Sequence, residues 1–293
     1  MAVFQKKTTL VHHITYMGIM AAINLIFILL ATYVPFLMFL LLLVLPFVST
    51  IVSYYCLKRY YIIYALASIG LCLIFNINDT IFYVIPAVIT GFLIGFLLDK
   101  KINPFWLILS SSVLESFLTF AFIPLINIIG NIDIVQTFLA IFKLDSFPYK
   151  EELTYLFIYF LALVQCSLSH FILFSDAKKI GIEINTCITS FAPFIIGEKA
   201  VIILCLIFSF FYAPIAYVLL AISLYFAVFL LVDIILNKKK IGFVILGALM
   251  VISFFVFASL YSMIIKPYGL LLMVLFPLAI GITSFVNNYL LNR

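Results

Sequence analysis

The chain has 293 residues, of which 67% are hydrophobic and only 9% are charged, and its net charge is +5. This composition excludes an ordinary soluble domain, in which about a quarter of the residues carry a charge. Repeated apolar runs of membrane-spanning length predict an all-α, polytopic transmembrane helical bundle. The positive charge fits membrane topology and attraction to anionic lipid, so it does not indicate a nucleic-acid partner.

Ten apolar segments predict transmembrane helices. They cover residues 13–34, 36–57, 60–75, 81–98, 105–129, 153–174, 199–212, 214–236, 241–265 and 268–290. The seventh has two interpretations, because Glu198 and Lys199 interrupt a longer apolar region that starts near residue 187. We favour residues 187–197 lying at the inner surface. In the alternative the helix starts at residue 187 and is broken near Pro193 and Gly197, and a total of nine spans is also possible.

Basic residues predict the orientation, since the cytoplasmic loops of membrane proteins are enriched in lysine and arginine. With the N-terminus inside, thirteen of the 16 basic residues fall at inner ends and loops. The three outer ones are Lys143, Lys150 and Lys266. This asymmetry supports an even number of spans, both termini in the cytoplasm and a multi-pass protein of the plasma membrane. Lys6 and Lys7 precede an apolar run that is long for a signal peptide, so we expect it to stay as a transmembrane helix.

Two spans carry small residues four positions apart, which lie on one helix face and let another helix approach closely. In the first span the pair is Gly18 and Ala22, and Asn24 adds a polar side chain nearby. In the fourth span the pair is Gly91 and Gly95. We interpret the fourth-span pair as packing inside the bundle. For the first-span pair, the sequence leaves two alternatives open: packing inside the bundle and docking of a partner helix.

Glu115 lies about ten residues inside the fifth span, and no other acid lies so clearly inside a span. A carboxylate at that depth is costly, so it usually faces a protein interior or a cavity and has a partner. Gln165 lies at a similar depth in the sixth span, counted from the cytoplasmic ends. Because consecutive spans are usually neighbours, we expect Glu115 and Gln165 to lie close together. The pair either locks the helices together or contacts a solute or ion.

Three further polar residues are candidate ligand-binding residues near the outer ends of spans: Asn127, Asn78 and Asp79. The residues between the third and fourth spans, including Asn76, can instead cap the helix that follows, since asparagine and aspartate suit that position. The longest outer connection, at 130–152, has apolar residues at helical spacing. That spacing predicts an amphipathic helix on the outer membrane surface or over a cavity.

Patterns typical of enzymes and metal sites do not occur in the sequence. It contains no GxxxxGK(S/T) phosphate-binding loop, no HExxH and no GxSxG turn. The five cysteines lie in or beside apolar segments without CxxC or metal-type spacing, which favours buried free thiols. We therefore predict no catalytic residues, no cofactor and no metal site. An enzyme that acts on lipid with Glu115 as its base is an alternative.

Lys6-Lys7 and the segment HHITYMGIMAAINLIFILLATYVPF resemble the start of S components, the substrate-binding subunits of energy-coupling factor transporters. The fourth-span segment VIPAVITGFLIGFLLDKK is similar to that family as well. The resemblance covers roughly residues 6–175 and implies six membrane helices with a solute pocket that opens outward. It also implies a transmembrane coupling subunit and two ATPases as partners. Gly18 and Ala22 then match the two alanines that meet the coupling subunit, with glycine replacing the first.

The chain is longer than ordinary S components and looks most like a related family of bacterial membrane proteins with additional C-terminal spans. We predict a six-span domain at 1–180 and a membrane extension of about four spans at 181–293. The leading hypothesis is a transport subunit that binds a small solute and is energised by separate coupling and ATPase subunits. The alternatives are a proton-coupled carrier that uses Glu115 and a membrane scaffold or assembly factor.

Overall fold

The computed structural model describes residues 6–34, 38–130, 133–141, 150–182, 192–236, 240–261 and 272–286, and all regular structure in these ranges is helical. Seven described helices are long and apolar enough to cross a membrane: Leu10–Tyr33, Lys58–Phe75, Ile77–Asp99, Pro104–Gly130, Thr154–Leu173, Pro193–Phe211 and Ala213–Leu231. Shorter apolar helices cover Val44–Tyr55, Val244–Phe257 and Leu272–Phe285. The chain is therefore an all-helical membrane protein, as predicted. The number of spans and their orientation stay predictions.

The chain divides into two compact units. The first consists of Met1–Ile134 and Leu161–Cys187, and the second of Val135–Phe160 and Ile188–Arg293. The long helix α8 (Lys150–Ile180) is therefore shared between the units. Its residues up to Phe160 belong to the second unit, and those from Leu161 onward belong to the first. The predicted division into domains at residue 180 stays a prediction.

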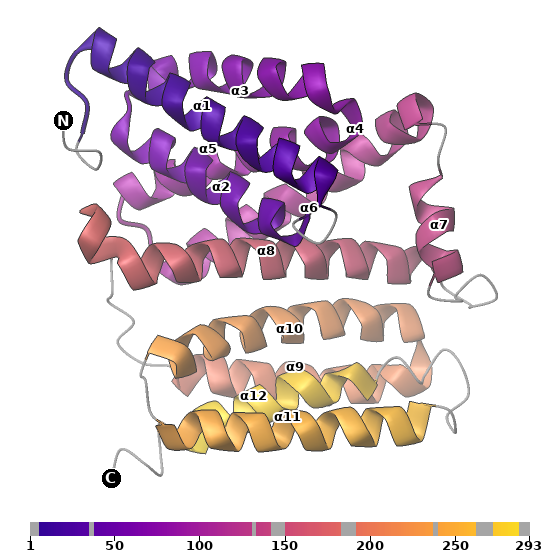
Figure 1. The fold of residues 1–293 in the computed structure, drawn as a ribbon. Helices are drawn as coiled ribbons and strands as arrows, with labels where there is room; N and C mark the ends of the chain where they lie inside the picture. Colours follow the sequence, from indigo (N-terminus) through magenta and orange to yellow (C-terminus); the bar gives the residue numbers. More distant parts are fainter. Residues whose placement is uncertain are drawn as a thin grey trace. The chain divides into compact units, whose positions relative to one another are not determined.

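The first unit contains α1 (Leu10–Tyr33), α2 (Met38–Tyr55), α3 (Tyr61–Phe75), α4 (Ile77–Asp79), α5 (Ile85–Asp99), α6 (Pro104–Gly130) and most of α8. α5 packs along α2 and also contacts α6, while α1 packs against α2 and α3 (Figure 1). A π-helical turn, Thr80–Val84, joins α4 to α5 in one continuous apolar segment. Large apolar side chains form the core of this unit, among them Met17, Ile28, Tyr64 and Ile94.

Gly91 and Gly95 lie where α5 packs on α2. A Cβ atom added at Gly91 would lie 3.0 Å from the carbonyl oxygen of Pro46, and one added at Gly95 would lie 2.8 Å from that of Thr50. Backbone atoms cannot move aside as a flexible side chain can, so glycine is required at this close approach. The predicted packing role of the pair is confirmed.

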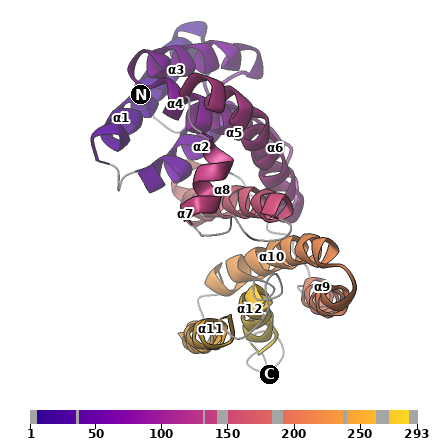
Figure 2. The same cartoon turned by 90° about the vertical axis from the view of Figure 1, so that its right-hand side faces the viewer.

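The second unit contains α7 (Ile134–Ile141, from Val135 onward), α9 (Ala192–Phe211), α10 (Ala213–Leu236), α11 (Lys240–Tyr261) and α12 (Leu275–Phe285). α12 contacts α9, α10 and α11 and lies between them (Figure 2). α7 confirms that the connection at 130–152 contains a helix, and its Leu139 is buried in one apolar cluster with Ile202 and Tyr217. Residues 131–132 and 142–149 of that connection lie outside the described ranges. Its position at the membrane surface stays a prediction.

α9 differs from the predicted seventh span, which we expected to begin at residue 199 after a surface segment. The helix runs unbroken over Ala192–Phe211, through both Pro193 and Gly197. Pro193 is the second residue of the helix, where its missing N–H costs no hydrogen bond. A Cβ added at Gly197 would lie 3.3 Å from the ring of Phe226 on α10, so this glycine marks a packing face and not a break. Residues 187–191 lie outside the described ranges.

Candidate functional site

A buried carboxyl group lies where α5, α6 and α8 of the first unit meet. Glu115 of α6 is only 3% exposed. Gln165 of α8 donates its side-chain amide to Glu115 Oε1 at 3.0 Å, and Thr90 of α5 donates its hydroxyl to Glu115 Oε2. The expected closeness of Glu115 and Gln165 is confirmed. Thr90, which is not among the residues predicted from the sequence, joins Glu115 and Gln165 in a group of three that we call the Glu115 cluster.

Helix geometry explains why Thr90 and Glu115 meet. Thr90 lies nine residues before the end of α5 at Asp99, and Glu115 lies eleven residues after the start of α6 at Pro104. At about 1.5 Å per residue, these positions are roughly 14 and 17 Å from the ends that the short connection joins. Such a connection keeps consecutive helices adjacent and antiparallel. Counting residues from the same ends of the fourth and fifth spans places Thr90 at about the depth of Glu115. This count is the sequence signal that could have identified Thr90.

The Glu115 cluster suits a ligand that donates hydrogen bonds or carries positive charge. Both donors within the cluster are neutral, so neither of them balances a negative charge on Glu115. A proton, a cation or a solute amine would reduce the cost of keeping that carboxyl group in a membrane helix. Within the described residues, no group of three or more His, Cys, Asp or Glu side chains could hold a metal ion. The cluster therefore offers a carboxyl site for a small solute or a proton.

The other candidate ligand-binding residues lie towards the far ends of their helices. Asp79 accepts a hydrogen bond from Asn76 Nδ2 at 2.6 Å, and its backbone N–H donates to Asn76 Oδ1 at 3.0 Å. The capping alternative is thereby confirmed, with Asn76 as the N-cap. Asn78 is exposed. Asn127 lies twelve residues beyond Glu115 on α6, about 18 Å along the helix. A ligand-binding role for Asn78, Asp79 and Asn127 stays a prediction.

A second buried polar group joins α1, α2 and α3. Asn24 Nδ2 donates to Tyr64 Oη and to Ser68 Oγ, both at 2.8 Å. Ser49 Oγ and Tyr64 Oη lie 2.9 Å apart. Asn24 stands out in the sequence as a polar residue of the first span, but its hydrogen-bond partners come from other helices. A buried polar side chain needs hydrogen-bond partners, so Asn24 must face α3. These bonds therefore determine which face of α1 is turned towards the other helices.

Another face of α1 carries Gly18 and Ala22, and both residues are exposed. A Cβ atom added at Gly18 would meet no atom of the described residues within 4 Å. Ile14 and Ile26, one turn before and one turn after the pair, are 47% and 52% exposed. Within the described part of the first unit, no helix covers this surface, so Gly18 and Ala22 do not pack against the helices of that unit. Docking of a partner helix at this surface stays a prediction.

A second buried acid, Glu198, lies in α9, inside a helix that is long and apolar enough to cross a membrane, whereas we expected Glu115 alone to lie clearly inside a span. Glu198 lies in an apolar helix of the second unit and is fully buried. Neither of its carboxyl oxygens has a hydrogen-bond partner in the part of the chain that the structure describes. Oε2 occupies the space that a Cβ atom of Gly281 on α12 would fill. The sequence signal for this position is the apolar run on both sides of Glu198, part of which is predicted above to lie at the inner surface.

Comparison with known proteins gives no match to any family model, curated protein or solved structure. The class of protein to which the chain belongs is therefore argued only from its helices and its buried residues. The chain is an all-helical membrane protein whose first unit encloses a carboxyl-centred polar cluster.

Proposed function

We propose that the protein is the solute-binding subunit of a membrane transporter and is energised by separate coupling and ATPase subunits. The observation that carries this proposal is the exposure of Gly18 and Ala22 on α1. In lipid, helices associate through close packing, and small residues allow the two backbones to approach. The resemblance to S components assigns the contact with the coupling subunit to the same two positions.

A contrast within the first unit supports this assignment. Gly91 and Gly95 have the same spacing as Gly18 and Ala22, but they are buried against α2. Within the described part of the first unit, one small-residue pair therefore packs against a neighbouring helix and the other is exposed, which supports a contact with a partner. The bonds of Asn24 to α3 hold α1 in the rotation that turns Gly18 outward.

The Glu115 cluster supports a solute site in the same unit. Solute sites in membrane proteins combine apolar walls with a few polar groups that fix orientation. A carboxyl group favours a small solute with an amine or another hydrogen-bond donor, which would take over one of the contacts made by Thr90 or Gln165. Binding would thereby replace one hydrogen bond to the Glu115 carboxyl group by another hydrogen bond from the solute.

Purification of Gly18→Leu tests the docking surface. We expect the wild-type protein to retain a transmembrane coupling partner and an ATPase pair in mild detergent, and Gly18→Leu to lose them. The variant should stay folded, because in the described structure no atom lies within 4 Å of an added Cβ and leucine favours helix more than glycine does. Gly70→Leu on α3 is the matched control, since Gly70 is also exposed and has the same open surroundings. Retention of both partners by Gly18→Leu would contradict the docking role.

Mass spectrometry of small molecules released from the denatured protein tests the solute site. We expect the wild-type protein to release a solute with an amine or another hydrogen-bond donor, and Glu115→Gln to release much less of it. Glu198→Gln is the matched control, because it makes the same chemical change at a buried glutamate of the second unit. Equal amounts of solute from Glu115→Gln and the wild-type protein would argue against a solute site at Glu115.

A proton-coupled carrier is the second candidate, favoured by the neutral donors around Glu115. A glutamate in such surroundings can take up and release a proton as a solute binds and leaves. This function predicts uptake into vesicles that follows an imposed proton gradient without ATP. Glu115→Gln should abolish that uptake, whereas Gly18→Leu should leave it unchanged. The pair of variants therefore separates the carrier from the transporter subunit.

A further inference from the structure

The second unit contains a buried carboxyl group that does not belong to the Glu115 cluster. Glu198 of α9 has no exposed surface. In the part of the chain that the structure describes, neither of its carboxyl oxygens has a hydrogen-bond partner. Its carboxyl carbon and both carboxyl oxygens lie within 3.1 Å of the position that a Cβ atom of Gly281 would take. The absence of a side chain at this glycine of α12 therefore makes room for the carboxyl group.

The surroundings of Glu198 along α9 are apolar. Ile195, one turn before Glu198, is buried in an apolar cluster with Leu230 and Ile280. Ile202, one turn after it, is buried in another apolar cluster of the second unit. An ionised carboxyl group is costly in such surroundings unless charged or hydrogen-bonding groups compensate it. Such groups would have to come from α9 itself or from α10 and α12, which pack against it.

The described side chains of α10 and α12 supply no charge to Glu198. α12 has no charged or titratable residue over Leu275–Phe285. The titratable residues of α10 whose side chains are described are Tyr217 and Tyr225, and phenol groups are uncharged at neutral pH. A negative charge on Glu198 would therefore have no balancing charge on the described side chains of these two helices.

Lys199, the next residue of α9, is the described charged group that acts on Glu198. Its ammonium group does not bond to either Glu198 oxygen. It lies instead 4.2 Å from the ring centre of Phe285, one turn beyond Gly281 on α12. Glu198 lies six residues after the start of α9 at Ala192, which is about 9 Å along the helix. A proton on Glu198 therefore has a short distance to travel to the water at that end of a candidate span.

We propose that Glu198 is a proton-binding site of the second unit, and that its carboxyl group holds an exchangeable proton while α9 is packed on α12. A neutral carboxyl group is much less costly than a carboxylate among apolar side chains. Release of the proton leaves a carboxylate beside Gly281 without a donor and draws it towards Lys199, so proton release changes the contact between α9 and α12. The site is independent of the proposed transport function, since it uses none of the residues of the Glu115 cluster or the Gly18 surface.

Infrared spectroscopy of the full chain in lipid tests the proposal, because a neutral carboxyl group and a carboxylate absorb at different frequencies. Exposed acids are almost fully ionised at pH 7, and the buried acids among the described residues are Glu115 and Glu198. We expect the difference spectrum between the wild-type protein and Glu198→Gln at pH 7 to contain the band of one neutral carboxyl group. The matched control is Glu115→Gln, which should keep that band. A carboxylate band in the difference spectrum would overturn the proposal.

Lys199→Met covers the case in which Glu198→Gln does not fold, because this variant keeps the carboxyl group. It is best compared in the Glu115→Gln background, where Glu198 is the remaining buried acid of the described structure. If Glu198 holds a proton at pH 7, Lys199→Met should leave the band of the neutral carboxyl group unchanged. A neutral band that appears only after Lys199→Met would show that Glu198 is ionised and stabilised by Lys199, which contradicts the proposal.

Transfer to heavy water tests whether the proton is exchangeable. Replacement of the proton by a deuteron should shift the Glu198 band to lower frequency, because Glu198 lies close to one end of its helix. A band that keeps its frequency after prolonged transfer would show that the proton is a fixed part of the fold. That result would overturn the assignment of Glu198 as a proton-binding site.

Discussion

The side-chain amide of Gln165 donates to the carboxyl group of Glu115 at 3.0 Å, and this bond links α8 to α6 inside the first unit. We predict that Gln165→Ala lowers the free energy of unfolding by about 1–3 kcal/mol, because it leaves a buried carboxyl oxygen without its donor. Ser167→Ala on the same helix is the control, since the Ser167 hydroxyl is buried and has no hydrogen-bond partner in the described structure. Denaturant or thermal unfolding in detergent measures both. Equal losses of stability would show that the Gln165 bond contributes nothing specific.

The two small-residue pairs predict opposite effects of one added methyl group. Gly91→Ala should destabilise the protein by about 1–3 kcal/mol, because α2 leaves no space for the new Cβ. Gly18→Ala should be neutral or stabilising by up to about 1 kcal/mol, because alanine favours helix and the position is open. The free energies of unfolding of the two variants, measured in the same detergent, give the comparison. A destabilised Gly18→Ala would indicate that α1 is covered at this position.

A pair of substitutions in the second unit tests the contact between Glu198 and Gly281. Gly281→Ala should be destabilising, since its methyl group would overlap Oε2 of Glu198. Adding Glu198→Ala removes the obstructing side chain, so the double variant should be more stable than the sum of the single effects by about 1 kcal/mol or more. Gly247→Ala on α11 is the control, because an added Cβ there meets no atom of the residues that the structure describes within 4 Å. Strictly additive effects would mean that the two residues do not interact.

Cysteine labelling tests the predicted orientation. Asp133, just before α7, and Lys101, just after α5, are both exposed. In a variant that lacks the five native cysteines, a membrane-impermeant maleimide added to intact cells should label Asp133→Cys and not Lys101→Cys. Labelling of both should follow when the membrane is made permeable. The reverse pattern in intact cells would invert the topology.

Hydropathy and helical depth could be interpreted without a structure. The length of the apolar runs indicated an all-helical membrane protein. In lipid, the backbone N–H and C=O groups of a segment must form hydrogen bonds with each other, and a helix achieves this within a single segment. The similar depth of Glu115 and Gln165 predicted their contact, since residues equally far from one membrane surface can meet on neighbouring helices. Applied to Thr90, the same count would have completed the cluster. Gly91 and Gly95 were correctly interpreted as packing residues.

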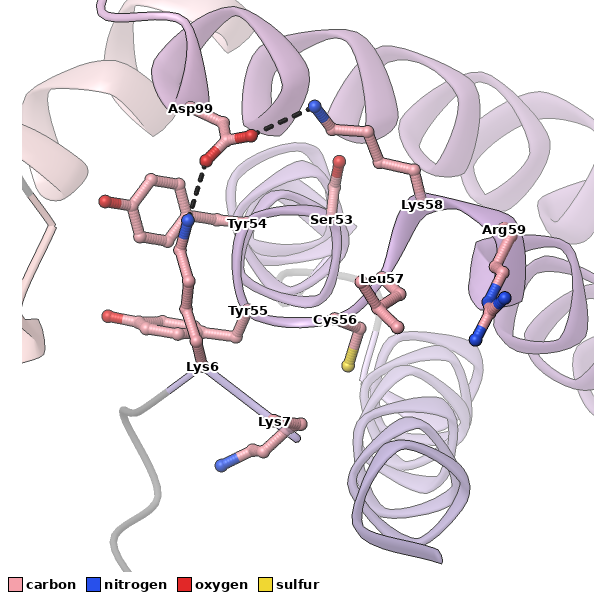
Figure 3. Close-up of a pocket in the computed structure, with 10 residues that line it drawn as sticks. All are labelled: Lys6, Lys7, Ser53, Tyr54, Tyr55, Cys56, Leu57, Lys58, Arg59 and Asp99. Atoms are coloured by element: carbon pink, nitrogen blue, oxygen red, sulfur yellow. Dashed lines mark hydrogen bonds and ion pairs between the residues drawn. The ribbon is translucent and has the colours of Figure 1, made fainter. Parts of the chain in front are cut away.

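The rotation of each helix was decided only by tertiary structure. Spacing shows that Gly18 and Ala22 share a face, as Gly91 and Gly95 do, but it does not show what that face contacts. The Asn24 bonds turn Gly18 outward, and the packing of α12 buries Glu198. The pocket drawn in Figure 3 is likewise formed by segments that are far apart in the chain: the residues before α1, the connection from α2 to α3 and the end of α5. The physical reason is that hydrophobicity sets the depth of a helix in the membrane, whereas shape and hydrogen-bond partners on other helices set its rotation.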